Sequence, residues 1–329
     1  MDQINKQNQC KLSDIRDCIE ENQYFLLTSH VKPDGDGLSS LLVFARILEH
    51  FGKTYQIFVD DPIPDKFDFI SEMRGIQTFD AHTYQFKPDV VVCLDASGLD
   101  RIGNVAQVIP QGAKIINIDH HPSNTGFGDL NCVNDQLSGT VELVYQLFDF
   151  CQVPMSADVA TMVYTGVMCD TGRFLFPNTT HESLGLCSQM IQEGASPDQI
   201  AENIYYRKTP ETVYAMANAL SNMQMHFDGT VSSIHLCNGH YAPKDKIDTE
   251  GFIDHLMMID SSEVSFFILE NEPGSYRVSL RSKNYVDVNL VAQAFGGGGH
   301  KRAAGCTMSG TVEDIRNRIL DVLEKQMKR

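Results

Sequence analysis

Short apolar runs that stop at polar residues recur along the first part of the chain. Runs of this kind span residues 24–29, 54–59, 89–94 and 113–116. Nearly continuous apolar runs are typical of strands buried on both faces of a parallel sheet. Helical periodicity follows at 38–50 and again at 156–168. This alternation predicts an α/β fold, with a parallel sheet that carries helices on both faces.

The pattern changes after a region rich in glycine and proline. The following part predicts a helix at 210–223, a hairpin around Asp228-Gly229, strands at 264–269 and 276–281, and a final helix at 312–326. This is the pattern of a smaller α+β unit. We therefore expect a catalytic domain at 1–190, a linker at 191–210 and a second domain at 211–329.

Polar clusters with metal-binding side chains follow several of the predicted elements. Together they supply six donors, namely His30, Asp34, Asp36, Asp95, His120 and Asp170. Strands of a parallel sheet end at one edge, where ligands usually bind. Two imidazoles and four carboxylates without a thiolate suit two divalent ions. We expect Mn²⁺, with Mg²⁺ or Co²⁺ as alternatives. Asp95 is the natural bridging ligand between the two ions.

Each cluster also has a simpler interpretation when it is taken alone. Pro33-Asp34-Gly35-Asp36-Gly37 has the composition of a solvated turn, and a run of glycines such as 296–299 is most often a flexible linker. The glycine run, however, follows an apolar segment and precedes a predicted strand. Its backbone N–H groups would be free to approach a phosphate.

Charge and cysteine usage narrow the class of protein. A formal net charge of −17 excludes a protein that holds long duplex nucleic acid by neutralising many phosphates. Nine scattered cysteines without a Cys-x-x-Cys pair are typical of thiols kept reduced. No apolar segment reaches the length of a membrane span or of a signal-peptide core. We expect a cytoplasmic protein without a membrane partner.

These motifs, in this order, resemble those of the DHH phosphoesterase superfamily, which is named for the tripeptide present here as Asp119-His120-His121. The resemblance also covers His30-x-x-x-Asp34-x-Asp36, Leu94-Asp95 and Asp170-Thr171-Gly172. The segment from Gly296 to His300, followed by Ala303-Ala304-Gly305, resembles the glycine-rich loop of a DHHA1-type carboxy-terminal domain. That loop distinguishes the chain from family II inorganic pyrophosphatases, which share the metal motifs but carry a different second domain.

Within the superfamily, the chain is most similar to the stand-alone nanoRNases of the A type, which are oligoribonucleases. Many of them also dephosphorylate 3′-phosphoadenosine 5′-phosphate. The resemblance implies a two-metal phosphoesterase that cleaves short RNA oligonucleotides or this nucleotide through a metal-bridging hydroxide, in a cleft between the domains. RecJ exonucleases and membrane cyclic-dinucleotide phosphodiesterases carry further segments that have no counterpart here.

The resemblance also implies a role for individual residues. His30 and Asp34 would hold one metal ion, Asp36, His120 and Asp170 the other, and Asp95 both. Asp119 would fix the tautomer of a histidine, and His121 would contact the scissile phosphate, so that the catalytic set is Asp95, Asp119 and His121. Substrate binding would fall to Arg281, Gly298, Gly299 and His300.

Other functions remain open at this stage. The same metal site would serve a phosphodiesterase for linear dinucleotides derived from cyclic di-AMP, or an exopolyphosphatase. A nucleotide-binding scaffold without activity would be expected to lack ligands, and none is missing here. The oligomeric state stays open as well, with a homodimer as one option.

Overall fold

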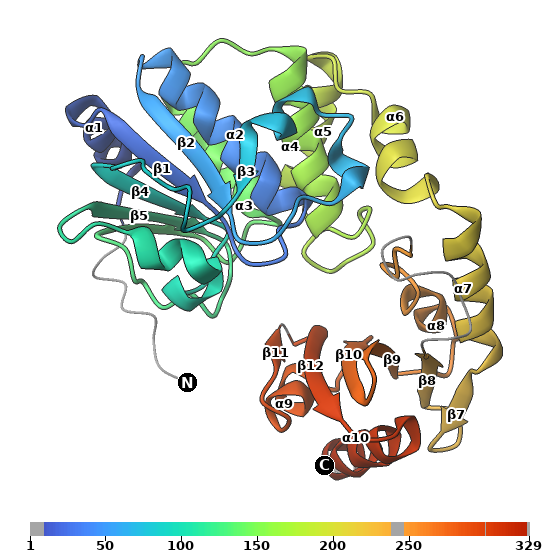
Figure 1. Cartoon of the computed structure of the whole chain (residues 1–329). Coiled ribbons are helices and arrows are strands. Elements are labelled where there is room, and N and C mark those ends of the chain that lie inside the picture. Colours follow the sequence, from blue (N-terminus) through green and yellow to red (C-terminus); the bar gives the residue numbers. More distant parts are fainter. Residues whose placement is uncertain (1–9, 238–246, 300, 328–329) are drawn as a thin grey trace. The chain divides into compact units, whose positions relative to one another are not determined.

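Two six-stranded sheets, one in each of two units, form the framework of the protein (Figure 1). The computed structural model describes residues 10–237, 247–299 and 301–327. The first unit comprises residues Met1–Arg207 and the second Lys208–Arg329. Much of the stretch 191–210 that we predict as a linker is helical and belongs to the first unit.

The sheet of the first unit is entirely parallel, as predicted, with the strand order β3-β2-β1-β4-β5-β6. Its strands are β1 (Tyr24–Thr28), β2 (Thr54–Val59), β3 (Ile76–Thr78), β4 (Val90–Leu94), β5 (Lys114–Asp119) and β6 (Leu130–Val133). β4 lies in the centre and is buried along its whole length, which explains its continuous apolar sequence. The short edge strands β3 and β6 were not predicted.

Helices cover both faces of this sheet, but they are of two kinds. The α-helices of the unit are α1 (Leu12–Glu21), α2 (Gly35–His50), α3 (Thr140–Phe150), α4 (Ala157–Asp170), α5 (His181–Gln192) and α6 (Pro197–Ala201). α1 to α4 share a core with one face of the sheet, where Phe25 and Val92 are buried. The opposite face, with Leu26 and Val91, is covered by the 3-10 segment Leu99–Val108. Shorter 3-10 turns lie at Asp65–Phe67 and Ser71–Gly75, and a π-helical turn at Glu202–Tyr206.

Two of the helix ends that differ from the predicted ones concern the polar clusters. α2 begins at Gly35 rather than at residue 38, because the Asp34 carboxylate caps it by accepting hydrogen bonds from Asp36 N (3.0 Å) and Gly37 N (3.2 Å). Asp36 therefore lies in the first helical turn. α4 continues to Asp170, so this carboxylate is carried by the last residue of a helix.

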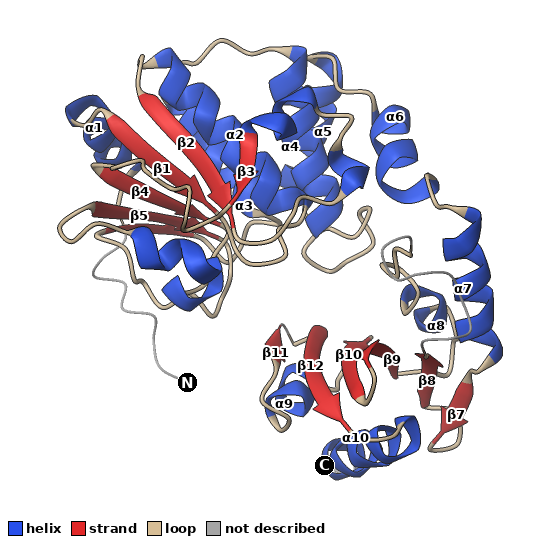
Figure 2. Cartoon of the chain, viewed as in Figure 1, coloured by secondary structure: helices blue, strands red, loops and turns tan. Residues whose placement is uncertain are grey.

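The second unit is a smaller α+β unit with a mixed sheet, in the order β11-β12-β10-β9-β8-β7 (Figure 2). Its strands are β7 (Gln224–His226), β8 (Val231–Leu236), β9 (Val264–Glu272), β10 (Ser275–Ser282), β11 (Gly298–Gly299) and β12 (Ala303–Ser309). Its helices are α7 (Pro210–Ser221), α8 (Asp254–Met257), α9 (Val288–Gln293) and α10 (Val312–Met327). The predicted hairpin is confirmed, since β7 and β8 pair antiparallel around Asp228-Gly229.

Two observations concern the chain as a whole. Within the described residues, no helix combines the length and the apolar character that crossing a lipid bilayer requires. All nine cysteines are free thiols.

Candidate metal centre

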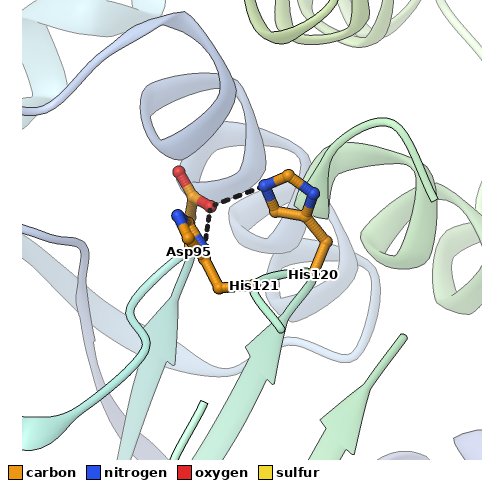
Figure 3. A group of neighbouring side chains, drawn as sticks. All are labelled: Asp95, His120 and His121. Atoms are coloured by element: carbon orange, nitrogen blue, oxygen red, sulfur yellow. Dashed lines mark ion pairs between the residues drawn. The ribbon is translucent and has the colours of Figure 1, made fainter. Parts of the chain in front are cut away.

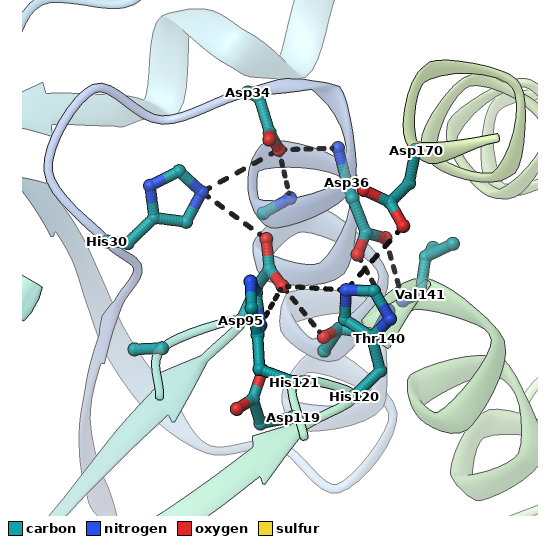
Figure 4. A network of polar contacts seen from close by, with 12 residues as sticks. His30, Asp34, Asp36, Asp95, Asp119, His120, His121, Thr140, Val141 and Asp170 are labelled. Atoms are coloured by element: carbon teal, nitrogen blue, oxygen red, sulfur yellow. Dashed lines mark hydrogen bonds and ion pairs between the residues drawn. The ribbon is translucent and has the colours of Figure 1, made fainter. Parts of the chain in front are cut away.

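The polar clusters meet at one edge of the parallel sheet. His30 follows β1, Asp95 follows β4, and Asp119 is the last residue of β5. The first turn of α2 and the last residue of α4 bring Asp36 and Asp170 to the same place (Figure 4). The carboxyl ends of neighbouring parallel strands are adjacent, so segments far apart in the sequence deliver their side chains to one point.

All six predicted ligands take part in groups that could hold a metal ion. In one group, His30, Asp34 and Asp95 place their donor atoms within 4.8 Å of one another. A second group, within the same limit, consists of Asp36, His120 and Asp170. We refer to these as the His30 trio and the His120 trio. Their donors are oxygen and nitrogen only, which is the set that Mn²⁺ and Mg²⁺ accept.

Asp95 belongs to the His30 trio and also reaches the His120 trio. Its Oδ2 is 3.4 Å from His30 Nε2, and its Oδ1 is 3.7 Å from His120 Nε2. Thr140 Oγ1 donates a hydrogen bond of 3.0 Å to the same Oδ1. The backbone of Asp95 is left-handed, with φ +57°, a conformation that aspartate tolerates better than most residues. Because each carboxylate oxygen faces a different trio, the geometry suits a ligand shared by two ions.

The two histidines of the trios present the same ring atom to the centre. His30 Nδ1 lies 2.8 Å from the carbonyl oxygen of Val31, and His120 Nδ1 lies 3.4 Å from that of Leu137. A proton on Nδ1 satisfies each carbonyl and leaves the Nε2 lone pair facing the carboxylates. This is the orientation that a metal-binding histidine requires.

Burial concentrates negative charge at the centre. Asp36 is only 1% exposed and Asp95 only 2%. Burial, together with the charges of Asp95 and Asp170, raises the pKa of Asp36 well above its ordinary value. Burial likewise raises the pKa of Asp170 to about 7, although His120 acts in the opposite direction. These carboxylates resist ionisation when no cation is near. A divalent cation would stabilise their ionised form, so the residues fit a metal site.

Burial does not decide the direction of the pKa shift of Asp95 or of His30, because the two side chains face each other. Burial opposes the ionisation of Asp95, yet the hydrogen bond from His30 and the charges of His121 and His30 lower its pKa. Burial also opposes the charged form of His30, but hydrogen bonds to Asp34 and Asp95 raise its pKa well above the ordinary value. A proton on His30 therefore compensates part of the negative charge that an ion would otherwise neutralise.

His121 is held by a buried carboxylate. Its Nδ1 lies 2.7 Å from Asp119 Oδ1, and Asn124 Nδ2 donates to the other oxygen of Asp119 at 2.6 Å. Asp119 is fully buried. Burial opposes the charged form of His121, but the hydrogen bond to Asp119 and the charge of Asp95 raise its pKa to about 9. Asp95, His120 and His121 form a third group of potential donors (Figure 3).

The amino terminus of α3 holds Asp36, a contact that the sequence did not reveal. Thr140 N donates to Asp36 Oδ2 at 2.6 Å, and Val141 N donates to Oδ1 at 2.9 Å. Backbone N–H groups at a helix start favour a negative charge. Asp36 and Thr140 lie 104 residues apart, and no local pattern connects them.

The predicted substrate residues belong to the second unit. Arg281 lies on β10, where its Nη1 donates to the carbonyl oxygen of Leu280 at 3.1 Å, while its buried Nε has no partner among the described residues. Burial lowers the pKa of this guanidinium. Gly298 and Gly299 form β11, which pairs with β12. His300 lies outside the described residues.

An α/β sheet that gathers six oxygen and nitrogen donors at its carboxyl edge defines the class of metal-dependent hydrolases. Residues 25–167 match the model of the DHH family N-terminal domain, and residues 240–329 match that of the DHHA1 domain. The chain is 31% identical to the bifunctional oligoribonuclease and PAP phosphatase NrnA of Thermus thermophilus, over 92% of this chain and 90% of the relative. It therefore belongs to the DHH family.

Two further comparisons agree with this assignment. The chain is 30% identical to the bifunctional oligoribonuclease and PAP phosphatase NrnA of Bacillus subtilis, over 92% of this chain and 94% of the relative. The crystal structure of an exopolyphosphatase-related protein from Bacteroides fragilis superimposes with a TM-score of 0.87 at 27% identity. That match covers 95% of both chains.

Proposed function

We propose that the chain is a two-metal phosphoesterase that hydrolyses short oligoribonucleotides, 3′-phosphoadenosine 5′-phosphate, or both. The observation that carries the proposal is the position of Asp95, whose Oδ2 faces His30 within its own trio and whose Oδ1 faces His120 of the other trio. The substrates are those in the names of the two NrnA relatives, which resemble the chain over nearly its whole length.

The first unit would hold the ions. His30 and Asp34 are assigned to one ion, Asp36, His120 and Asp170 to the other, and Asp95 to both, with Mn²⁺ as the favoured metal. Two such ions, when bound, lower the pKa of water and neutralise charge on a phosphate. The protein residues supply the fixed geometry, because backbone groups already hold Asp36, His30 and His120 in place.

His121 is assigned to the scissile phosphate. Its Nδ1 lies 2.7 Å from Asp119 Oδ1, and this contact fixes the orientation of the ring. The oriented ring can then donate a proton to a phosphate oxygen or to the leaving group. Asp119 acts on the substrate only through His121, since it is fully buried.

Substrate recognition is assigned to the second unit. The guanidinium of Arg281 is partly buried and its buried Nε has no partner among the described residues, so a phosphate oxygen would supply the missing partner. The exposed backbone of Gly298 and Gly299 and the side chain of His300 would add donors beside it. A catalytic domain at 1–190, a linker at 191–210 and a substrate-binding domain at 211–329 follow from this division of roles. The nine free cysteines favour a cytoplasmic location.

A substrate panel tests the proposal. The purified protein, supplied with Mn²⁺, is assayed with 3′-phosphoadenosine 5′-phosphate and with oligoribonucleotides of two to five residues, including the linear dinucleotide made by opening cyclic di-AMP. Product analysis should show release of phosphate or of mononucleotides, and Asp95→Asn should abolish both. Metal binding without hydrolysis of any of these substrates would refute the assignment and favour a nucleotide-binding scaffold.

Polyphosphate is a second candidate substrate. It is favoured by the high structural similarity to the exopolyphosphatase-related protein of Bacteroides fragilis. Because a polyphosphate chain has no base or ribose, its hydrolysis at a rate above that of every nucleotide would reassign the substrate while keeping the metal site.

A further inference from the structure

Asn178, in the loop that follows α4, contacts the metal centre from outside the set of ligands. Its Nδ2 lies 3.2 Å from Asp170 Oδ2, 3.2 Å from the Asp170 carbonyl oxygen and 3.0 Å from the Ser138 carbonyl oxygen. All three partners are acceptors, so the amide nitrogen must face them. The buried Oδ1 on the other side of the amide has no donor among the described residues.

The loop that carries Asn178 is folded tightly on itself. Leu175 N and Phe176 N both donate to the Thr171 carbonyl oxygen at 3.0 Å, and Phe174 N donates to Thr171 Oγ1 at 3.2 Å. The Phe176 ring packs so closely on Gly172 that a Cβ there would meet it at 2.5 Å. This hydrogen-bonded turn brings Asn178 close to Asp170, which lies eight residues earlier in the sequence.

The carbonyl oxygen on the other side of Asn178 belongs to an equally fixed segment. Ser138 N donates to the buried carboxylate of Glu142 at 3.1 Å, and the Ser138 hydroxyl donates to it as well. Neighbouring residues of this segment hold the remaining two members of the His120 trio. The Leu137 carbonyl orients His120, and the N–H groups of residues 140 and 141 hold Asp36.

We propose that Asn178 is a positioning residue that fixes the Asp170 carboxylate and thereby sets the metal affinity of the His120 trio, without affecting the His30 trio. The inference rests on the proposed two-metal site. The Asp170 side chain is 25% exposed, whereas the Asp36 side chain is buried and held by two N–H groups. Without the amide, the contact with His120 would be left to hold the Asp170 carboxylate in the trio against repulsion from Asp34 and Asp95.

Titration of the metal-free protein with Mn²⁺, followed by calorimetry and by the electron paramagnetic resonance of free Mn²⁺, tests this inference. The wild type should bind two ions. Asn178→Ala should weaken one of the two binding steps by roughly 10- to 100-fold, the range known for residues that orient metal ligands, and leave the other unchanged. With nucleotide substrate, kcat at low Mn²⁺ should fall and recover at high Mn²⁺, with an unchanged KM.

Two further variants separate positioning from a general loss of structure. Asn178→Ser removes the amide but keeps a small polar side chain, and it should weaken the same binding step. Asn22→Ala removes an amide that donates to the Cys18 carbonyl at 2.7 Å, elsewhere in the first unit, and should leave both steps unchanged. The melting temperature of each metal-free variant reports its folding.

The outcomes are distinct. Unchanged Mn²⁺ binding in Asn178→Ala and Asn178→Ser would overturn the inference, and so would an equal loss at both sites together with a lowered melting temperature. Wild-type protein that binds two ions but hydrolyses no nucleotide would refute the proposed function alone. Hydrolysis by a wild type whose Asn178 variants bind Mn²⁺ normally would refute the positioning role alone.

Discussion

Gly139 lies against the Asp36 carboxylate, and replacing it by alanine tests how finely that ligand is placed. An added Cβ would lie 2.9 Å from Asp36 Oδ1 and 3.1 Å from Oδ2. The backbone at Gly139 is extended, with φ −162° and ψ 161°, so alanine is accommodated there without backbone strain. Gly139→Ala therefore changes the room available to the carboxylate and little else.

The size of the effect follows from the distances. An ordinary contact needs 3.4 Å, so the carboxylate must retreat by about half an ångström, whereas metal ligation tolerates roughly 0.2 Å. The same shift takes the 2.9 Å hydrogen bond from Val141 N beyond the normal range. Loss of a hydrogen bond to a charged group costs about 1.5–3 kcal/mol. We expect Mn²⁺ affinity at the His120 trio to fall roughly 10- to 100-fold.

Calorimetric titration with Mn²⁺ measures this change directly. Gly185→Ala is a matched control, because the added Cβ on α5 meets no atom within 4 Å. The control should bind Mn²⁺ like the wild type. If Gly139→Ala also binds two ions with wild-type affinity and retains full activity, then the position of the Asp36 carboxylate does not determine Mn²⁺ affinity. That result would refute the prediction.

The remaining predictions concern the second unit. Burial opposes the ionisation of Glu263, but hydrogen bonds from the N–H groups of residues 284–286 lower its pKa. Glu263 therefore adds to the free energy of unfolding above its ordinary pKa of about 4.3, and this contribution is lost as the pH falls through the lower pKa of the folded state. In chemical denaturation at several pH values, Glu263→Gln should not show this loss of stability in acid. Arg281→Met removes a partly buried guanidinium whose buried Nε has no described partner, so it should raise the melting temperature while raising KM for 3′-phosphoadenosine 5′-phosphate more than about tenfold. Gly297→Ala would place a Cβ 2.2 Å from a backbone oxygen and should unfold this unit in a thermal melt, whereas Gly298→Ala, with its nearest neighbour at 3.9 Å, should melt normally and raise KM only.

The fold and the six donors were predictable because their signals are local. Strands β1 and β4 are nearly continuous apolar runs, and His30 and Asp95 follow these runs. The rule that ligands lie at the carboxyl edge of a parallel sheet then brings the clusters together. No distance between side chains was needed for that step.

Features that depend on contacts between distant segments were not predictable. Thr140 and Asn178 carry no pattern of their own, and their roles appear only when their partners are in place. The α2 start was placed too late because a capping side chain, here Asp34, also resembles a turn residue. The 3-10 cover at Leu99–Val108 bends at Gly103, which interrupts helical periodicity.

The central claim is that two divalent ions share Asp95. Anomalous diffraction at the manganese absorption edge, from crystals grown with Mn²⁺, locates such ions without reference to any assay. The account predicts two peaks, one among His30, Asp34 and Asp95 and one among Asp36, His120 and Asp170, with Asp95 between them. A single peak, or peaks away from these residues, would contradict it.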